Sequence, residues 1–162
     1  MIEECLHEHP DVQLAAAVGR PDAYAGEIPV AYVELKADAK VTSEELRQFA
    51  EERIFERPAL PAEVILIDHM PVTAVGKIFK PDLRYDIIER TYRPLLTEIA
   101  GDCISFDISV GAEGSHGILA SVTVTVDAEN KKPALSEKIQ DILGPYPVNY
   151  RLFFKVAELA GT

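Results

Sequence analysis

Six short apolar segments with strand-like patterns most constrain the fold of this chain. They are residues 11–19, 28–35, 64–67, 104–110, 118–126 and 150–156. Alternation of apolar residues at a period of two, seen most clearly in the first and the last three segments, is typical of β-strands. Segments with apolar residues at helical spacing lie among them. Their ranges are 2–9, 42–54, 81–93 and 135–142. We therefore predict an α+β fold.

The order of these segments divides the chain into two predicted domains, residues 1–100 and 101–162. After Gly101 the pattern restarts with two alternating segments, a helix and a last strand, which predicts a compact β-β-α-β unit. A Gly-rich turn at 111–117 joins the first two strands. The preceding stretch, 87–99, is apolar at helical spacing without Gly or Ser, so we expect no flexible tether. We expect the second unit to pack on the first or to form a homodimer.

Local features make finer predictions. Thr42 and Glu45 form a capping box that opens a helix closed by Pro58. Pro29 lacks an amide donor, so its strand is expected to have a free edge or a bulge there. Pro94 is expected to bend or end its helix. The hairpin of the second unit is expected to bury one face. That face would consist of Ile104, Phe106, Ile108, Val122, Val124 and Val126.

Composition excludes several classes of protein. The chain has 162 residues, of which 48% are hydrophobic, which is enough for a core. Its net charge of −11 disfavours nucleic-acid binding. No apolar run approaches the roughly 20 residues of a membrane span. Cys5 and Cys103 are far apart, as expected for a reduced, cytoplasmic protein. A helix that begins at Ile2, with only Met1 to cap it, predicts a piece of a longer protein.

The Gly76-Lys77 pair is the sharpest local signal. A phosphate-binding P-loop needs glycine five residues before Gly76 and Ser or Thr after the lysine. Pro71 and Ile78 occupy these positions, so this is not a P-loop. The alternatives are a lysine held at a loop tip for catalysis, where its point charge could neutralise reacting anions, or an ordinary solvated lysine. The stretch 77–93 also has more basic than acidic side chains, unlike the rest of the chain.

Several spaced motifs together resemble one family. In order they are Ile2-Glu3-Glu4, His9-Pro10-Asp11-Val12, Ala15–Asp22, Gly26–Val33, the helix start Thr42–Glu45, and Pro71, Thr73, Gly76-Lys77-Ile78 and Leu83-Arg84. This series resembles the small C-terminal domain of the adenylate-forming superfamily, which includes acyl-CoA synthetases, adenylation domains and luciferases. The resemblance covers about residues 2–84. Residues past 100 match nothing in the family pattern.

The resemblance implies a two-step ligase. ATP and a carboxylic acid, with Mg in the N-terminal adenylation domain, would give an acyl-adenylate and pyrophosphate, and a thiol, usually CoA, would then displace AMP. The C-terminal domain would rotate between the steps. Lys77 would be catalytic in the first step, with Thr73 and Gly76 supporting its loop. Gly26 and Glu27 would face CoA in the second step, or would serve only at the start of a strand.

The resemblance also implies that other parts lie outside this chain, namely the adenylation domain and a Gly-rich hairpin ahead of Ile2. The chain alone is therefore expected to be inactive. Residues 56–61 depart from the family's Tyr-Lys-x-Pro stretch, so we expect the local surface, and any CoA contact there, to differ from the family's. His7 and His9 are not spaced to share a metal on a helix, and we expect no metal site. The rival interpretation is a non-catalytic or regulatory module that uses residues 101–162 to bind a partner or small molecule.

Overall fold

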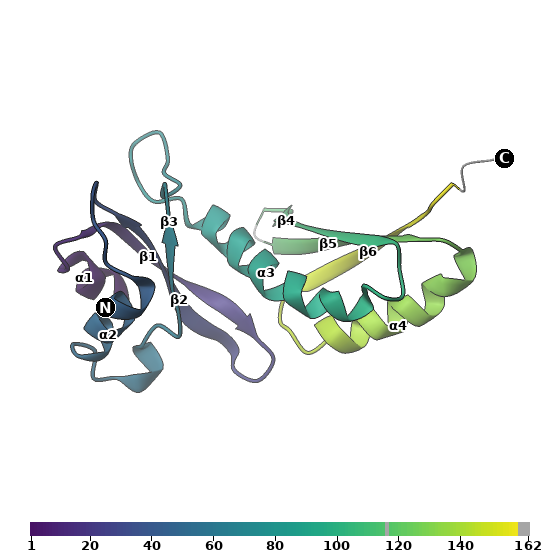
Figure 1. Ribbon diagram of the computed structural model, residues 1–162, viewed down its shortest axis with the longest axis horizontal. Coiled ribbons are helices and arrows are strands. Elements are labelled where there is room, and N and C mark those ends of the chain that lie inside the picture. The colour runs from purple at the N-terminus through teal and green to yellow at the C-terminus, as the bar shows by residue number, and fades with distance from the viewer. Residues whose placement is uncertain (116, 159–162) are drawn as a thin grey trace. The chain divides into compact units, whose positions relative to one another are not determined.

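The computed structural model describes residues 1–115 and 117–158 (Figure 1). The chain forms an α+β structure with two three-stranded sheets, which confirms the predicted fold class. It divides into two compact units. The first contains Met1–Arg20 and Glu27–Arg84, and the second contains Pro21–Gly26 and the chain from Tyr85 onward. Each unit has its own hydrophobic core and is described by itself.

The first unit is built on the sheet β1-β2-β3, with β2 in the centre. Its elements, in chain order, are α1 (Ile2–His7), β1 (Val12–Asp22), β2 (Gly26–Leu35), α2 (Ser43–Glu51), a 3-10 turn η1 (Arg57–Ala59) and β3 (Val64–Ile67). Strand β3 runs parallel to β2, from the pair Ala31–Val64 to the pair Glu34–Ile67. Helices α1 and α2 lie on one side of this sheet (Figure 1) and share a core with it.

The predicted capping box is confirmed at the start of α2. The Glu45 amide donates to the Thr42 hydroxyl at 3.2 Å, and the Thr42 amide donates to the Glu45 carboxylate at 2.8 Å. Leu46 and Ala50 face the core, as the helical spacing predicts. The helix ends at Glu51, well before Pro58, which lies in the separate turn η1.

The first strand of this unit is longer than the sequence predicts, and its first two strands are each buried on two faces. Strand β1 continues to Asp22, past the predicted end of the segment at residue 19. It also buries the consecutive residues Ala15 and Ala16, so both of its faces are covered there. Strand β2 is buried on both faces at 30–33. Its Pro29 lies ahead of the parallel register with β3, and the Pro29 carbonyl accepts the Ala62 amide at 2.9 Å.

The second unit confirms the β-β-α-β order. Helix α3 (Lys80–Leu96) contributes residues 85–96, followed by the 3-10 turn η2 (Thr97–Ile99), β4 (Ser105–Glu113), β5 (Gly117–Val126), the turn η3 (Glu129–Lys131), α4 (Lys132–Leu143) and β6 (Asn149–Val156). The central strand β5 is antiparallel to β4 and parallel to β6. Figure 1 shows helix α4 running alongside this sheet.

Helices cover the apolar face of the second sheet. Its core contains Tyr92, Leu96 and Ile99 together with Val122, Val124 and Val126 of β5, and α4 adds Leu135, Ile139 and Leu143. Tyr92 is fully buried, and its ring packs edge-on against Tyr146 at 5.5 Å between centroids. Burial raises the pKa of Tyr92 to about 12. Packing of this unit on the first one, or on a second copy, stays a prediction.

Three details of the second unit differ from the sequence predictions. Of the two alternatives for Pro94, a bend or an end, the end is excluded, because α3 continues to Leu96, and both Leu96 and Ile99 are buried in the core. Ile104 is 57% exposed, since it precedes the first sheet pair, Ser105–Thr125. The hairpin turn is also shorter than 111–117, because β4 extends to Glu113.

Candidate functional site

Lys77 lies in a small hairpin that follows β3. An antiparallel bridge between Val72 and Ile78 closes this hairpin. Within it, the Thr73 amide donates to the Lys77 carbonyl at 2.6 Å, and the Gly76 amide donates to the Thr73 carbonyl at 2.9 Å. The structure therefore brings the three predicted residues Thr73, Gly76 and Lys77 together in one turn.

The side chain of Thr73 and the backbone of Gly76 shape this turn. The Lys77 amide donates to the Thr73 hydroxyl at 3.2 Å. Gly76 has a φ of +83°, a left-handed conformation that L side chains rarely adopt. Lys77 itself is exposed, and no ion pair joins its ammonium group to any residue that the structure describes. An unpaired ammonium group on a hydrogen-bonded turn is available to bind an external anion.

Two carboxylates hold the segments on either side of this hairpin. The Met70 amide donates to Glu34 Oε2 at 2.6 Å. At the other end, Lys80 Nζ lies 2.5 Å from Glu3 Oε1, which also accepts from the Ala17 amide at 2.9 Å. Partial burial acts to raise the pKa of Glu3, but the hydrogen bonds from Lys80 and Ala17 outweigh it and lower the pKa below its usual 4.5.

Sequence reasoning missed both carboxylates. Glu34 is 36 residues from Met70, and Glu3 is 14 residues from Ala17, so no local spacing signals either contact. Glu3 was part of a family motif, but that motif alone assigned it no role. Only the sheet, which sets β2 beside β3, gives Glu34 its partner.

The predicted CoA-side residues lie at the start of β2. Gly26 has a φ of +79°, which explains the glycine there. Glu27 folds over Gly19, where an added Cβ would come within 2.3 Å of Glu27 Oε2. Glu27 and Arg84 line a cavity of about 390 Å³ that also includes Pro29 and Ala59. Among the described residues, the wall of this cavity contains none from the Lys77 hairpin. The cavity at Glu27 and the hairpin of Lys77 are therefore separate candidate sites.

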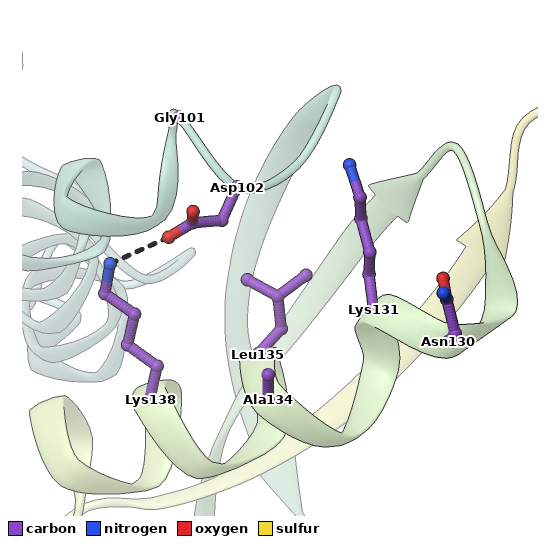
Figure 2. Close-up of a pocket in the computed structure, with 7 residues that line it drawn as sticks. All are labelled: Gly101, Asp102, Asn130, Lys131, Ala134, Leu135 and Lys138. Atoms are coloured by element: carbon purple, nitrogen blue, oxygen red, sulfur yellow. Dashed lines mark hydrogen bonds and ion pairs between the residues drawn. The ribbon is translucent and has the colours of Figure 1, made fainter.

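The second unit contains another cavity of about 390 Å³, between the loop at Gly101 and the first turns of α4 (Figure 2). Ala134 and Leu135 form its apolar part, and Lys138 bonds Asp102 across it at 2.8 Å. The hydrogen bond from Lys138 lowers the pKa of Asp102. Lys131, at the other end of the same helical face, pairs with Asp127 at 2.8 Å.

His7, the last residue of α1, and His9, which follows the helix, have structural partners. His7 bonds the Glu3 carbonyl and the Ala15 amide through its two ring nitrogens, at 2.7 and 3.2 Å. His9 packs edge-on against Phe49. Across residues 1–115 and 117–158, no group of three or more acidic, His or Cys side chains could hold a metal ion. None of the helices described is long and apolar enough to cross a membrane.

Comparison with known proteins identifies the first part of the chain. Residues 1–77 match the family model described as the AMP-binding enzyme C-terminal domain. Marinolic acid–CoA ligase from a Pseudoalteromonas species is 39% identical over 142 residues, which are 88% of this chain and 22% of that protein. Indoleacetate–CoA ligase from Aromatoleum aromaticum is 38% identical over 91 residues, 56% of this chain and 18% of that protein.

The crystal structure of apo MatB from Rhodopseudomonas palustris is 27% identical, with a TM-score of 0.49 over 57% of this chain and 17% of that chain. The chain thus spans only about a fifth of the length of the ligases it matches. The family match covers α1 to β3 and ends at Lys77, the lysine that the motif series singles out. By this match, residues 1–77 form a domain of the AMP-binding enzyme C-terminal family.

Proposed function

We propose that this chain is the mobile C-terminal domain of an ATP-dependent acid–thiol ligase and that Lys77 acts in the adenylation step. The main support is the exposed ammonium group of Lys77, which forms no ion pair among the described residues. It lies on a turn that is fixed by Thr73 and Gly76. A scaffold with no catalytic role has no need of a fixed turn that presents an unneutralised cation. The match of residues 1–77 to the AMP-binding enzyme family supports the same conclusion.

In the proposed first step, a carboxylate oxygen of the substrate attacks the α-phosphorus of ATP, and pyrophosphate leaves with its electron pair. Two anions must approach each other, so a positive charge between them stabilises the transition state. Lys77 supplies that charge, and the hairpin supplies its position. ATP and its Mg ion are bound by the adenylation domain, the proposed partner of this chain. We assign no Mg ligand to the described residues of this chain.

In the second step, a thiol sulfur attacks the acyl carbon and AMP leaves. We propose that this step uses the loop where Gly26 and Glu27 begin β2. Support comes from the cavity shared by Glu27 and Arg84, since a guanidinium group suits the phosphates of a CoA nucleotide. The thiol is CoA in the named relatives, marinolic acid–CoA ligase and indoleacetate–CoA ligase.

We propose that residues 1–100 form the ligase domain and that residues 101–162 are an appended unit of the same enzyme. The 142-residue match to marinolic acid–CoA ligase must extend well into the second sheet, and this supports the assignment of both parts to a ligase. A cytoplasmic location suits the free cysteines Cys5 and Cys103. A homodimer through the 101–162 unit remains part of the proposal.

The cavity of the second unit favours a second candidate, a binding module. A cleft of about 390 Å³ with apolar and charged walls is within the range of small-ligand sites (Figure 2). In this version residues 101–162 bind a small molecule or a partner, and Lys77 is an ordinary surface lysine. The two candidates differ in what Lys77 does, which makes them separable by experiment.

The test assays the two half-reactions on the chain alone and on a polypeptide that joins it to its adenylation domain. We expect no carboxylate-dependent pyrophosphate exchange from the chain alone and both half-reactions from the joined protein. Exchange by the chain alone would overturn the proposal. If the natural polypeptide has no adenylation domain and ligand binding maps to the α4 cavity, the binding module is the correct assignment.

A further inference from the structure

We propose that Glu34 and Glu3 are positioning residues, which hold the two ends of the Lys77 hairpin and thereby aim the lysine. This inference rests on the proposed function and goes beyond it, because it assigns roles to two carboxylates outside the hairpin. Neither is expected to touch the reacting atoms. Each acts on the lysine through the backbone or side chain that it anchors.

Glu34 fixes the segment that leads into the hairpin. It lies on the central strand β2, opposite Ile67, the last residue of β3. Its carboxylate accepts the Met70 amide at 2.6 Å, a short hydrogen bond with a carboxylate acceptor. The Met70 side chain is buried at 5% exposure, so this residue is held both by its amide and by its side chain. The start of the hairpin is therefore tied to the middle of the sheet.

Glu3 fixes the segment that leads out of the hairpin. Its Oε1 binds Lys80 Nζ at 2.5 Å and the Ala17 amide at 2.9 Å. Lys80 is the first residue of α3, three positions after Lys77. The contact therefore connects α1, β1 and the exit of the hairpin through one carboxylate. The lowered pKa of Glu3 agrees with a carboxylate that is ionised and bound at this position.

The hairpin depends on these anchors because its own contacts do not fix its direction. The bonds from Thr73 to Lys77 and from Gly76 to Thr73 hold the shape of the turn only. Its side chains bury little apolar surface, since Val72, Val75 and Phe79 are 49%, 85% and 41% exposed. Packing therefore cannot hold the hairpin against the sheet. The carboxylates at residues 34 and 3 supply the missing restraint on either side.

The first test measures hairpin motion in this chain by ¹⁵N relaxation. In the wild-type chain the Val75 and Lys77 amides should have order parameters near the rigid value of about 0.85. Glu34→Ala and Glu3→Gln should each lower them toward about 0.6, while the Leu46 amide in α2 stays unchanged. Glu4→Gln is the matched control, because Glu4 is 88% exposed and pairs only with the N-terminal amine among the described residues. Unchanged order parameters in both anchor variants would overturn the proposal.

The second test measures the two half-reactions in the ligase that contains this chain. Each anchor variant should slow adenylation by roughly 10- to 100-fold, the effect of a small misplacement of a catalytic group. Thioester formation from supplied acyl-adenylate should change less than about twofold. Glu34→Gln should restore most of the adenylation rate, because its amide oxygen can still accept from the neutral Met70 amide. Glu3→Gln should not do so, because it removes the negative charge that pairs with the Lys80 ammonium group. A general loss of structure would slow both half-reactions and would not be rescued in this way.

Lys80→Met provides the variant that is safe for folding, since the Lys80 side chain is 41% exposed. If Lys80 acts only through Glu3, Glu3→Gln combined with Lys80→Met should slow adenylation no more than either change alone. Additive losses would contradict the anchor at this end. If Lys77→Ala slows adenylation while the anchor variants do not, this inference fails and the proposed function stands. If Lys77→Ala has no effect, the proposed function fails, and the positioning role fails with it.

Discussion

The backbone amide of Lys77 donates to the side-chain hydroxyl of Thr73, 3.2 Å away, across the turn that carries the lysine. Thr73 also exchanges backbone contacts with Lys77 and Gly76, so one residue braces the whole turn from within. This bond is the local counterpart of the two carboxylates that hold the hairpin from outside.

Thr73→Val should therefore loosen the turn without changing its volume much. The loss of one hydroxyl hydrogen bond, worth ~1 kcal/mol, should slow adenylation by a factor of about five in the ligase. Thr73→Ser keeps the hydroxyl and serves as the control, with a rate close to that of the wild type. Equal losses in the two variants would show that the threonine methyl group matters and the hydroxyl does not.

Gly76→Ala tests the left-handed backbone of the same turn. The φ of +83° should make alanine cost about 1–2 kcal/mol in the hairpin, although an added Cβ would meet no atom within 4 Å. Urea unfolding of this chain measures that cost. Gly101→Ala is the matched control, because it too has open space around it but no positive φ. If both variants are equally stable, backbone strain is not the reason for glycine at position 76.

Local patterns predicted the parts of the fold that depend on residues close in sequence. The capping box needed only Thr42 and Glu45, and the turn at Lys77 needed only residues 71–78. The exposure of Ile104 and the continuation of α3 past Pro94 depended on sheet register and on the burial of Leu96, which no local pattern contains. The same limit hid Glu34, because its contact with Met70 exists only after β2 and β3 pair.

Tyr92 allows a test of the core of the second unit. Its phenol is fully buried and, within the part of the chain that the structure describes, donates only a long hydrogen bond, 3.4 Å, to the Val148 carbonyl. Tyr92→Ala should lower the unfolding free energy by about 3–5 kcal/mol through loss of packing. Tyr92→Phe should lower it by less than about 1 kcal/mol, because so little hydrogen bonding is lost. Urea unfolding at neutral pH compares the two.

The pKa of Tyr92 also predicts the behaviour at alkaline pH. Burial raises this pKa from 10 to about 12, so the folded state holds the proton more tightly than the unfolded state. Its contribution to stability is complete below pH 10 and is lost as the pH rises through about 12. Tyr92→Phe should therefore flatten the fall of the unfolding free energy between these values. Tyr24→Phe, at a fully exposed position, should leave the slope unchanged, and the same flattening there would contradict the assignment.

The most direct measurement of the central claim is the rate of carboxylate-dependent pyrophosphate exchange in the ligase with Lys77→Ala, beside thioester formation from supplied acyl-adenylate. Loss of a preorganised charge worth ~3–4 kcal/mol should slow exchange by roughly 10²- to 10³-fold and leave thioester formation nearly unchanged. Lys40→Ala, which removes an exposed lysine ahead of α2, should affect neither rate. Equal losses in both half-reactions, or an exchange rate equal to that of the Lys40 variant, would contradict a catalytic role for Lys77.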